Sequence, residues 1–440
     1  MQVIEPTARP RSVLYSAVPR RREDIPTLTG LRFVAAFSIL FMHTLEWTSP
    51  FNNAAFVRLL AAAVGLIGMP LFFVLSGFVI HYNYGASFHE QPYTTSLRNF
   101  FSARFARIYP LFLFFAVFGI ISDDMVNWVN GYIADLISCV MHTLTLTQSW
   151  VYEVLSSDHK LLLANGFGLS WSISCELFFY IAYVFFVFLI LPIRHPTSVM
   201  WAIVGYSASV ILILFLTYSN SDYLMSVAQN YVDIHSNEPD NSFFRWLFYY
   251  SPYVRIWEFI LGCLTAQLLL SIRRRPVTRK EAVLGAAGLF IGLFLLALYD
   301  TRYIMEVQDG APHIVTFFAL NFGCAVPIAM IIFCTARYES RVGDFLAHPW
   351  LVWLGEISFS IYAVHTWTLR PFIRPTTDFT AATAFDTVFR VGFAMIFTVI
   401  VASATYQIIE VPARRYFRRA LMRRAVSSGG SLALADRPTN

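Results

Sequence analysis

Charged residues are scarce in this sequence. Asp, Glu, Lys and Arg together make up 13% of its 440 residues, roughly half of the share that a soluble protein carries. Hydrophobic residues make up 57%, and the mean hydropathy is +0.57. This shortage of charge excludes an ordinary water-soluble domain. The composition predicts an all-α polytopic membrane protein, with its surplus of Phe and Tyr at surfaces that face lipid.

Cysteine is scarce as well. The five cysteines are an odd number and show no spacing typical of metal ligands, which argues against a disulfide framework and against a metal site. A nucleic-acid partner is not expected either. The formal charge of +5 comes from short basic clusters between apolar runs, a pattern typical of membrane topology signals.

Ten apolar segments are each close to the length that crosses a bilayer. They lie at about 30–47, 62–80, 108–121, 169–191, 199–216, 253–271, 282–299, 314–334, 354–370 and 388–409. Segment 132–150 is also apolar enough to cross, but it carries Asp135 and His142. We predict a re-entrant or interfacial helix there, because an eleventh crossing would reverse the orientation of every basic cluster after it.

The basic residues predict the orientation of these segments. With the N-terminus inside the cell, 24 of the 32 Lys and Arg residues lie on the cytoplasmic side, as the positive-inside rule requires. Both termini are then cytoplasmic. The predicted organisation is a cytoplasmic tail over residues 1–29, a transmembrane domain over residues 30–412, and a basic, partly disordered tail over residues 413–440.

The first segment contains an arginine and a histidine. His43 follows Arg32 by eleven positions, which on a helix places them about 16 Å apart along the axis and about 20° apart around it. They therefore share a face, and Glu46 can lie beside His43. An ionisable side chain near mid-bilayer is costly and is a functional candidate by default. The structural alternative is that Arg32 and Glu46 reach the two interfaces while His43 packs in the interior.

A pair of arginines opens the third segment. Arg104 and Arg107 are three positions apart, so on a helix they face the same way at its cytoplasmic mouth. Planar guanidiniums bond phosphate oxygens in a bidentate manner, which favours a phosphate or pyrophosphate ligand. Anchoring to anionic lipid explains the same spacing equally well.

Polar residues interrupt or end four other apolar runs. Glu176 lies in an aromatic helix and needs an imidazole or guanidinium from another helix as its partner. Ser76 with Gly77 favours close helix packing over chemistry. His365 and the Glu410-Val411-Pro412 stretch are structural more often than catalytic.

Six of these stretches, in order from Leu28 to Arg419, together resemble the membrane-bound acyltransferase 3 family, which includes O-antigen and exopolysaccharide O-acetyltransferases. The stretches are 28–32 with His43, 71–78, 104–110, 170–176, 360–365 and 410–412. The ten-span topology of that family agrees with the charge pattern. Met69-Pro70 and Ala363-Val364 depart from the family pattern, and neither departure touches the expected chemistry.

The resemblance implies that an acyl group, most often acetyl, moves from cytoplasmic acetyl-CoA to a hydroxyl of a glycan or lipid-linked glycan. It also implies a multi-pass protein of the bacterial cytoplasmic (inner) membrane, surrounded by lipid, with no bound cofactor and no metal. The implied roles are as follows: Arg32, Arg104 and Arg107 bind the acyl-CoA phosphates, His43 acts as general base or transient acyl carrier, Glu176 orients it, and Ser76, Trp171 and His365 give support.

Two alternatives remain open. A membrane-bound O-acyltransferase of the type that acylates lipids or proteins would use an intramembrane histidine, here His365. A proton-coupled exporter would use His43 and Glu176 as a proton relay. Transporters are often built from inverted repeats and broken helices, and the sequence shows neither, which argues against the exporter.

Overall fold

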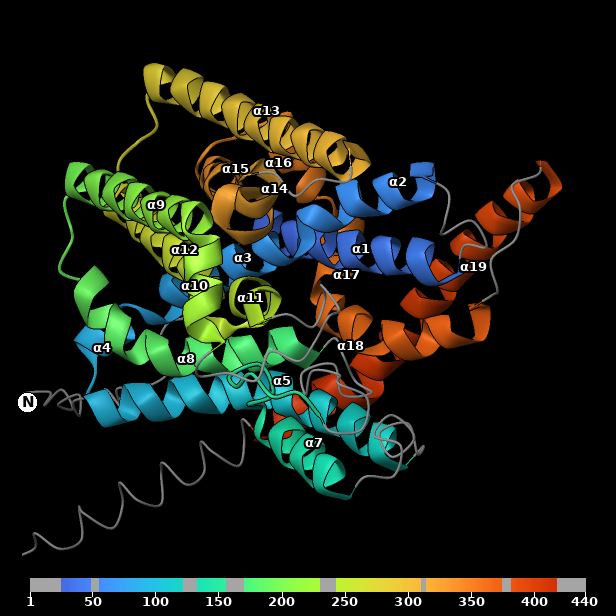
Figure 1. Cartoon of the computed structure of the whole chain (residues 1–440). Helices are drawn as coiled ribbons and strands as arrows, with labels where there is room; N and C mark the ends of the chain where they lie inside the picture. Colours follow the sequence, from blue (N-terminus) through green and yellow to red (C-terminus); the bar gives the residue numbers. More distant parts are fainter. Residues whose placement is uncertain are drawn as a thin grey trace, which may run out of the picture.

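The computed structural model describes residues 25–48, 55–121, 133–155, 170–229, 243–309, 314–373 and 381–417. Most of the two predicted tails and parts of the predicted outer loops lie outside these ranges. Within them the chain is helical almost throughout, and nine helices are long and apolar enough to cross a membrane. The prediction of an all-α polytopic membrane protein is therefore confirmed (Figure 1).

The helices follow one another without any β-sheet between them in the described ranges. Up to residue 228 they are α1 (Pro26–Thr48), α2 (Ala55–Leu66), α3 (Gly68–Tyr84), α4 (Ser87–Glu90), α5 (Tyr93–Ile121), α7 (Ile133–Thr145), α8 (Trp171–Ile190), α9 (Pro196–Ser219) and α10 (Ser221–Ala228). After residue 242 they are α11 (Phe243–Arg245), η4 (Trp246–Tyr250), α12 (Pro252–Ile272), α13 (Arg279–Asp309), α14 (Ile314–Phe318), η5 (Ala319–Gly323), α15 (Ala325–Arg337), α16 (Arg341–Leu346), α17 (Pro349–Glu356), α18 (Ser358–Leu369), η6 (Arg370–Phe372), α19 (Ala381–Thr405) and η7 (Tyr406–Glu410).

The predicted segment 354–370 is a broken helix. Its two halves, α17 and α18, meet at Ile357, whose φ of −88° and ψ of 3° interrupt the helical backbone. Just before the break, a side chain on Gly355 would collide with the backbone of Thr29, so this glycine lets α17 lie directly against α1. Ile67 between α2 and α3 keeps helical dihedrals, with φ of −83° and ψ of −20°, so residues 59–90 remain one span. The absence of broken helices that we inferred from the sequence is therefore wrong for segment 354–370, because isoleucine at the break gives no local sign of it.

Helix α5 is longer than the predicted segment 108–121. It begins at Tyr93 and continues through Pro110 to Ile121. The hydropathy pattern missed its first half because this half carries several arginines, which lower the apolar average. Two of these arginines, Arg104 and Arg107, consequently lie in the middle of α5 and not before its start.

Segment 132–150 contains a helix too short to cross a bilayer. Helix α7 has 13 residues and ends before Leu146, whose φ of 56° turns the chain sharply. The chain then runs through the interior, where the Ser174 hydroxyl donates to the backbone oxygen of Leu146 and the Trp246 indole donates to that of Ser149. These backbone groups are satisfied by protein, as a non-spanning segment at membrane depth requires.

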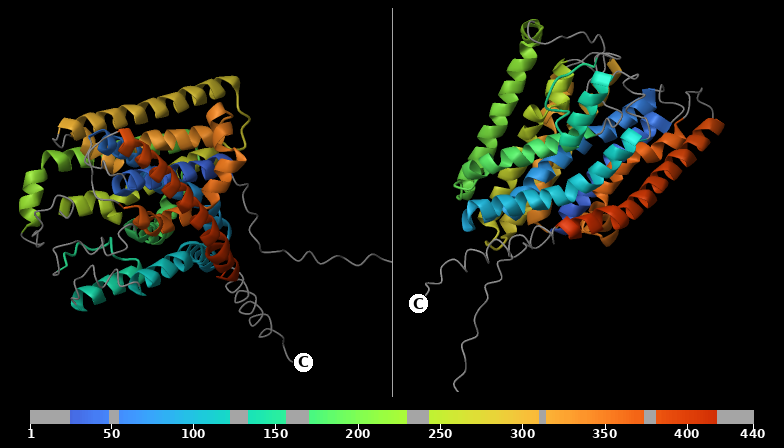
Figure 2. Two further views of the ribbon diagram at one scale, coloured as in Figure 1. Left: turned by 90° about the vertical axis from the view of Figure 1, so that its right-hand side faces the viewer. Right: turned by 90° about the horizontal axis from the view of Figure 1, so that it is seen from below.

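The centre of the bundle is the contact between α3 and α12. A side chain on Gly77 would collide with the backbone of Phe259, and one on Gly262 would collide with the backbone of Val74. Glycine at both positions lets the two backbones approach closely. In Figure 1, α13 runs along one side of the bundle and α5 with α7 along the opposite side. Figure 2 (right) shows the long helices running side by side.

Candidate active site

A cavity lies among α1, α3, α5, α8 and α18, and it brings together five of the predicted site residues. Arg32 of α1, Arg104 and Arg107 of α5, Glu176 of α8 and Ser76 of α3 all line it. The two arginines of α5 face the same way, as their spacing predicts. Residues from five helices that are distant in sequence thus meet at one polar site inside an apolar bundle.

Two tyrosines hold the charged groups of this cavity. Arg104 donates from Nη2 to the hydroxyl of Tyr84 over 3.1 Å, and its guanidinium lies 5.0 Å from the Tyr84 ring centroid. It also lies 6.0 Å from the ring centroid of Tyr180. The Tyr180 hydroxyl donates to Oε2 of Glu176 over 2.6 Å. Neither tyrosine was predicted as a site residue from the sequence, although the four-residue spacing of Glu176 and Tyr180 was a usable sign.

The cavity has more positive than negative charge. Three guanidiniums and one carboxylate line it, and Arg32 is repelled by Arg104 and Arg107 while only Glu176 attracts it among the groups at the cavity wall. Arg32 and Arg107 make no hydrogen bond or ion pair with any residue in the described part of the chain. Uncompensated charge in a low-dielectric interior is costly. The arrangement therefore favours an anionic ligand.

His43 forms a pair with His365. Nδ1 of His43 lies 3.1 Å from Nε2 of His365, and the two rings are stacked with centroids 5.2 Å apart. His43 is 9% exposed and His365 is fully buried. The ring of Trp47 stacks on His43 at 4.8 Å. The two histidines thus form a compact stack under an indole.

The hydrogen bonds fix the roles of the four ring nitrogens. Nδ1 of His365 lies 2.6 Å from the backbone oxygen of Tyr362. A carbonyl only accepts, so this nitrogen donates, and Nε2 of a neutral His365 accepts. Nδ1 of His43 therefore donates to it. This leaves Nε2 of His43 with its lone pair free, and it has no hydrogen-bond partner among the described residues.

The predicted partnership between Glu176 and His43 is not formed. Glu176 lies in the arginine cavity and bonds to Tyr180, whereas His43 bonds to His365. The physical reason is distance along α1: Glu176 lies at the level of Arg32, and His43 is about 16 Å further along the axis. Glu46 is exposed and makes no hydrogen bond with His43. The shared face of Arg32 and His43 is present, because both side chains turn toward α18.

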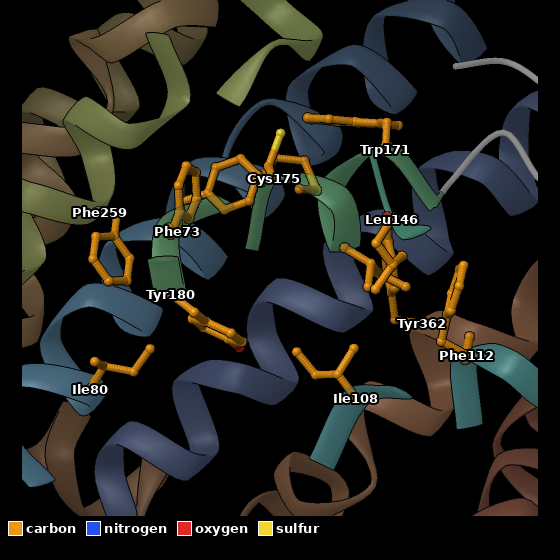
Figure 3. Close-up of a cluster of buried hydrophobic side chains, with 14 of the residues drawn as sticks. Phe73, Ile80, Ile108, Phe112, Leu146, Trp171, Cys175, Tyr180, Phe259 and Tyr362 are labelled. Carbon is orange, nitrogen blue, oxygen red and sulfur yellow. The ribbon is translucent and has the colours of Figure 1, made fainter. Parts of the chain in front are cut away.

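The predicted supporting residues have different surroundings. Ser76 faces the cavity, so close packing applies to its neighbour Gly77 and not to Ser76 itself. Trp171 does not line the cavity. Its ring packs edge-on against Phe73 at 6.1 Å and lies 5.5 Å from Tyr249. Figure 3 shows Trp171 among the buried side chains of the surrounding core.

Glu410 is a structural anchor in this arrangement. It is 2% exposed, accepts from the hydroxyl of Ser360 over 2.7 Å, and pairs with Arg414 at 3.3 Å. This links η7 to α18, which forms one wall of the cavity. The bonds agree with the structural interpretation of the Glu410-Val411-Pro412 stretch.

A buried ion pair in α12 escaped the sequence analysis. Arg255 and Glu258 are both fully buried and lie 3.1 Å apart. The Arg255 Nε donates to the backbone oxygen of Tyr249 over 2.7 Å, and its guanidinium covers the Tyr249 ring at 4.6 Å. Opposite charges three positions apart inside an apolar run were the sign that could have revealed it.

The fold and the site define an integral membrane protein with a cationic cavity and an adjoining histidine pair. In the described residues no cluster of His, Cys, Asp or Glu could hold a metal ion. The sequence matches the family profile of the acyltransferase domain over residues 25–407. The chain therefore belongs to the acyltransferase 3 family and is a membrane acyltransferase.

Two relatives illustrate the family. The acyltransferase MdmB of Streptomyces mycarofaciens is 30% identical over 368 residues, which cover 80% of this chain and 81% of that protein. The peptidoglycan O-acetyltransferase OatA of Listeria monocytogenes is 24% identical over 404 residues, which cover 90% of this chain and 56% of OatA. No matching solved structure was found.

Proposed function

We propose that this enzyme transfers an acyl group, most commonly acetyl, from cytoplasmic acyl-CoA to a hydroxyl of a cell-surface or exported glycan. The proposed location is the bacterial cytoplasmic membrane. The observation that carries the proposal is the cavity in which Arg32 and Arg107 face inward without an ionic partner in the described part of the chain. A family of acyltransferases needs an activated donor, and this cavity fits a donor that carries phosphates.

The arginines explain the choice of donor. A guanidinium binds phosphate oxygens with two parallel hydrogen bonds, and such charge-assisted bonds are stronger than neutral ones. Arg32, Arg104 and Arg107 supply three such groups, of which Arg104 is held in place by Tyr84. A donor without phosphates would leave the positive charge of the cavity uncompensated. CoA, with its pyrophosphate and its third phosphate, supplies this compensation.

His43 is the proposed general base. Its Nε2 would accept the proton of the acceptor hydroxyl while the hydroxyl oxygen attacks the thioester carbonyl carbon. The carbon–sulfur bond then breaks, and the CoA thiolate leaves and takes up the proton from His43. The products are the O-acylated acceptor and free CoA. His365 holds His43 in the required tautomer through its hydrogen bond, as a carboxylate does for the histidine of a catalytic triad.

The acceptor class is drawn from the relatives. OatA is named for O-acetylation of peptidoglycan, a glycan outside the cytoplasm. The alignment covers only 56% of OatA, so the acceptor of this chain is proposed as a glycan and not as peptidoglycan in particular.

Transfer itself is tested with purified protein in nanodiscs, radiolabelled acetyl-CoA, and crude cell-envelope glycan. The wild type is expected to move label to the glycan, and the His43→Ala variant is expected to lose this transfer while remaining folded and inserted. If the wild type used no donor from a panel of acyl-CoA thioesters, the proposed donor would be wrong, and an acyltransferase that takes its acyl group from another donor would replace it.

Donor binding has a matched control within one helix. Arg104→Gln and Arg107→Gln are each expected to raise KM for acetyl-CoA by about 10- to 100-fold, since a hydrogen bond to a charged group contributes roughly 1.5–3 kcal/mol. Arg98→Gln removes an exposed arginine of the same helix that does not line the cavity and should leave KM unchanged. Equal effects at all three positions would contradict a specific phosphate site.

A further inference from the structure

One stripe of α8 runs along the cavity. Ser172, Glu176 and Tyr180 all line it and are spaced four residues apart, so the stripe extends about 12 Å along the helix axis. Glu176 and Tyr180 lie at the end where Arg104 covers the Tyr180 ring. Ser172 lies at the opposite end. The cavity thus has a charged end and an end without charged side chains.

Tyr362 closes this second end together with Ser172. The two hydroxyl oxygens are 2.6 Å apart, and both side chains line the cavity. The Tyr362 ring packs edge-on against the ring of Phe72, with centroids 6.0 Å apart. Tyr362 is 8% exposed and Ser172 is 5% exposed. Packing on one side and a hydrogen bond on the other hold the Tyr362 ring in place.

Tyr362 also contacts the histidine pair. Its backbone oxygen accepts from Nδ1 of His365 over 2.6 Å, and the two rings lie 5.6 Å apart between centroids. Neither His43 nor His365 lines the cavity. Tyr362 is therefore in contact with both the cavity and the histidines. In Figure 3 its side chain lies in the same buried cluster as Ile108 and Tyr180, which also line the cavity.

We propose that Tyr362 and Ser172 form the end wall of the acyl-binding part of the cavity and thereby select the length of the acyl chain. The inference rests on the proposed function. With the CoA phosphates at the charged end, the thioester points toward Tyr362 and Ser172, the end of the cavity at which Tyr362 contacts His365, the hydrogen-bond partner of His43. A chain longer than acetyl meets the Tyr362 ring.

The test measures kcat/KM for acetyl-CoA and butyryl-CoA in the full chain. Tyr362→Leu replaces the ring that closes the cavity with a smaller side chain. It is expected to raise the ratio of kcat/KM for butyryl-CoA to kcat/KM for acetyl-CoA at least tenfold, because one methylene in an apolar pocket changes kcat/KM by about 10- to 200-fold. Ser172→Ala is expected to shift the ratio in the same direction. Ser172→Val fills the same end of the cavity and is expected to lower the ratio.

Phe359→Leu is the matched control, because Phe359 lines the same cavity from the same helix but makes no hydrogen bond or ring contact with Ser172 or His365, all three of which the structure describes. Its ratio should stay at the wild-type value. A merely structural role of Tyr362 would lower kcat/KM for both donors equally and leave the ratio unchanged, which would overturn the inference. A ratio shift of equal size in Phe359→Leu would also overturn it. If the wild type itself accepted no acyl-CoA, the proposed function would fail, and the inference with it.

Discussion

His43 and His365 lie 322 positions apart in the sequence, yet Nδ1 of one is 3.1 Å from Nε2 of the other. The acyltransferase 3 interpretation of the sequence assigned the base to His43, and the alternative of a lipid- or protein-acylating O-acyltransferase assigned it to His365. Their hydrogen bond couples them, so substituting either changes the tautomer or the orientation of its partner. A comparison of the two alanine variants consequently cannot separate the two enzyme classes.

Two substitutions of His365, compared with His43→Ala, test whether His43 is the general base and His365 the residue that positions it. His43→Ala should reduce acyl transfer by roughly 10²–10⁴-fold, the usual contribution of a general base. His365→Gln keeps an acceptor oxygen for Nδ1 of His43 and should lose less activity than His365→Leu, which keeps none. Initial rates of acetyl transfer at saturating donor measure this order. If His365→Gln were as inactive as His43→Ala while Tyr362 variants stayed active, His365 would be the base instead.

The sequence predicted the arginines of the cavity, but it did not predict the contact between the two histidines. Arg104 and Arg107 share a helix and a short spacing, so their common direction follows from helix geometry alone. The contact between His43 and His365 depends instead on how α1 packs against α18. Single-sequence periodicity describes each helix and carries no information on which helices touch. For this reason Glu176 was matched to the wrong partner.

The ends of the helices also divide into those that the sequence predicts and those that depend on packing. Long apolar runs such as α8 and α9 were located within a few residues of their observed ends. Helix α5 began 15 residues before the predicted segment, because its arginines are tolerated by a cavity that hydropathy cannot detect. The break at Ile357 lies two residues after Gly355, where α17 packs closely on α1, and it had no local sign in the sequence.

Tyr84 is predicted to position Arg104 for the donor. Tyr84→Phe removes the hydroxyl that accepts from Arg104 and keeps the ring beneath the guanidinium. The loss of one hydrogen bond to a charged group should raise KM for acetyl-CoA by roughly 10-fold, with kcat nearly unchanged. The control is Tyr93→Phe, which removes the hydroxyl of an exposed tyrosine at the start of α5, the helix that carries Arg104. It should change neither KM nor kcat. A fall in kcat at unchanged KM would assign Tyr84 to the chemical step.

The Arg255–Glu258 pair is predicted to matter for stability. Glu258→Ala leaves a fully buried guanidinium without its carboxylate, which should lower the free energy of unfolding by about 3–5 kcal/mol. Unfolding in mixed micelles with increasing SDS measures the difference. Glu339→Ala, at an exposed position, is the control and should lie within about 0.5 kcal/mol of wild type. The double change Arg255→Leu with Glu258→Leu should recover much of the loss, and failure to do so would point to a role beyond charge pairing.

The close approach of α3 and α12 predicts opposite effects for the same substitution at two glycines. Gly77→Ala places a methyl group against the backbone oxygen of Phe259, which cannot rotate away, so the two helices must separate at a cost of roughly 1–3 kcal/mol. Gly205→Ala in α9 meets no atom within 4 Å and removes a flexible residue from a helix interior, which should stabilise by about 0.5–1 kcal/mol. The same SDS titration compares both. Because Gly77 is next to Ser76 on the cavity wall, separation of the helices should also reduce donor binding in Gly77→Ala. A variant with normal stability and normal KM would mean that α3 and α12 do not approach each other as closely as this structure places them.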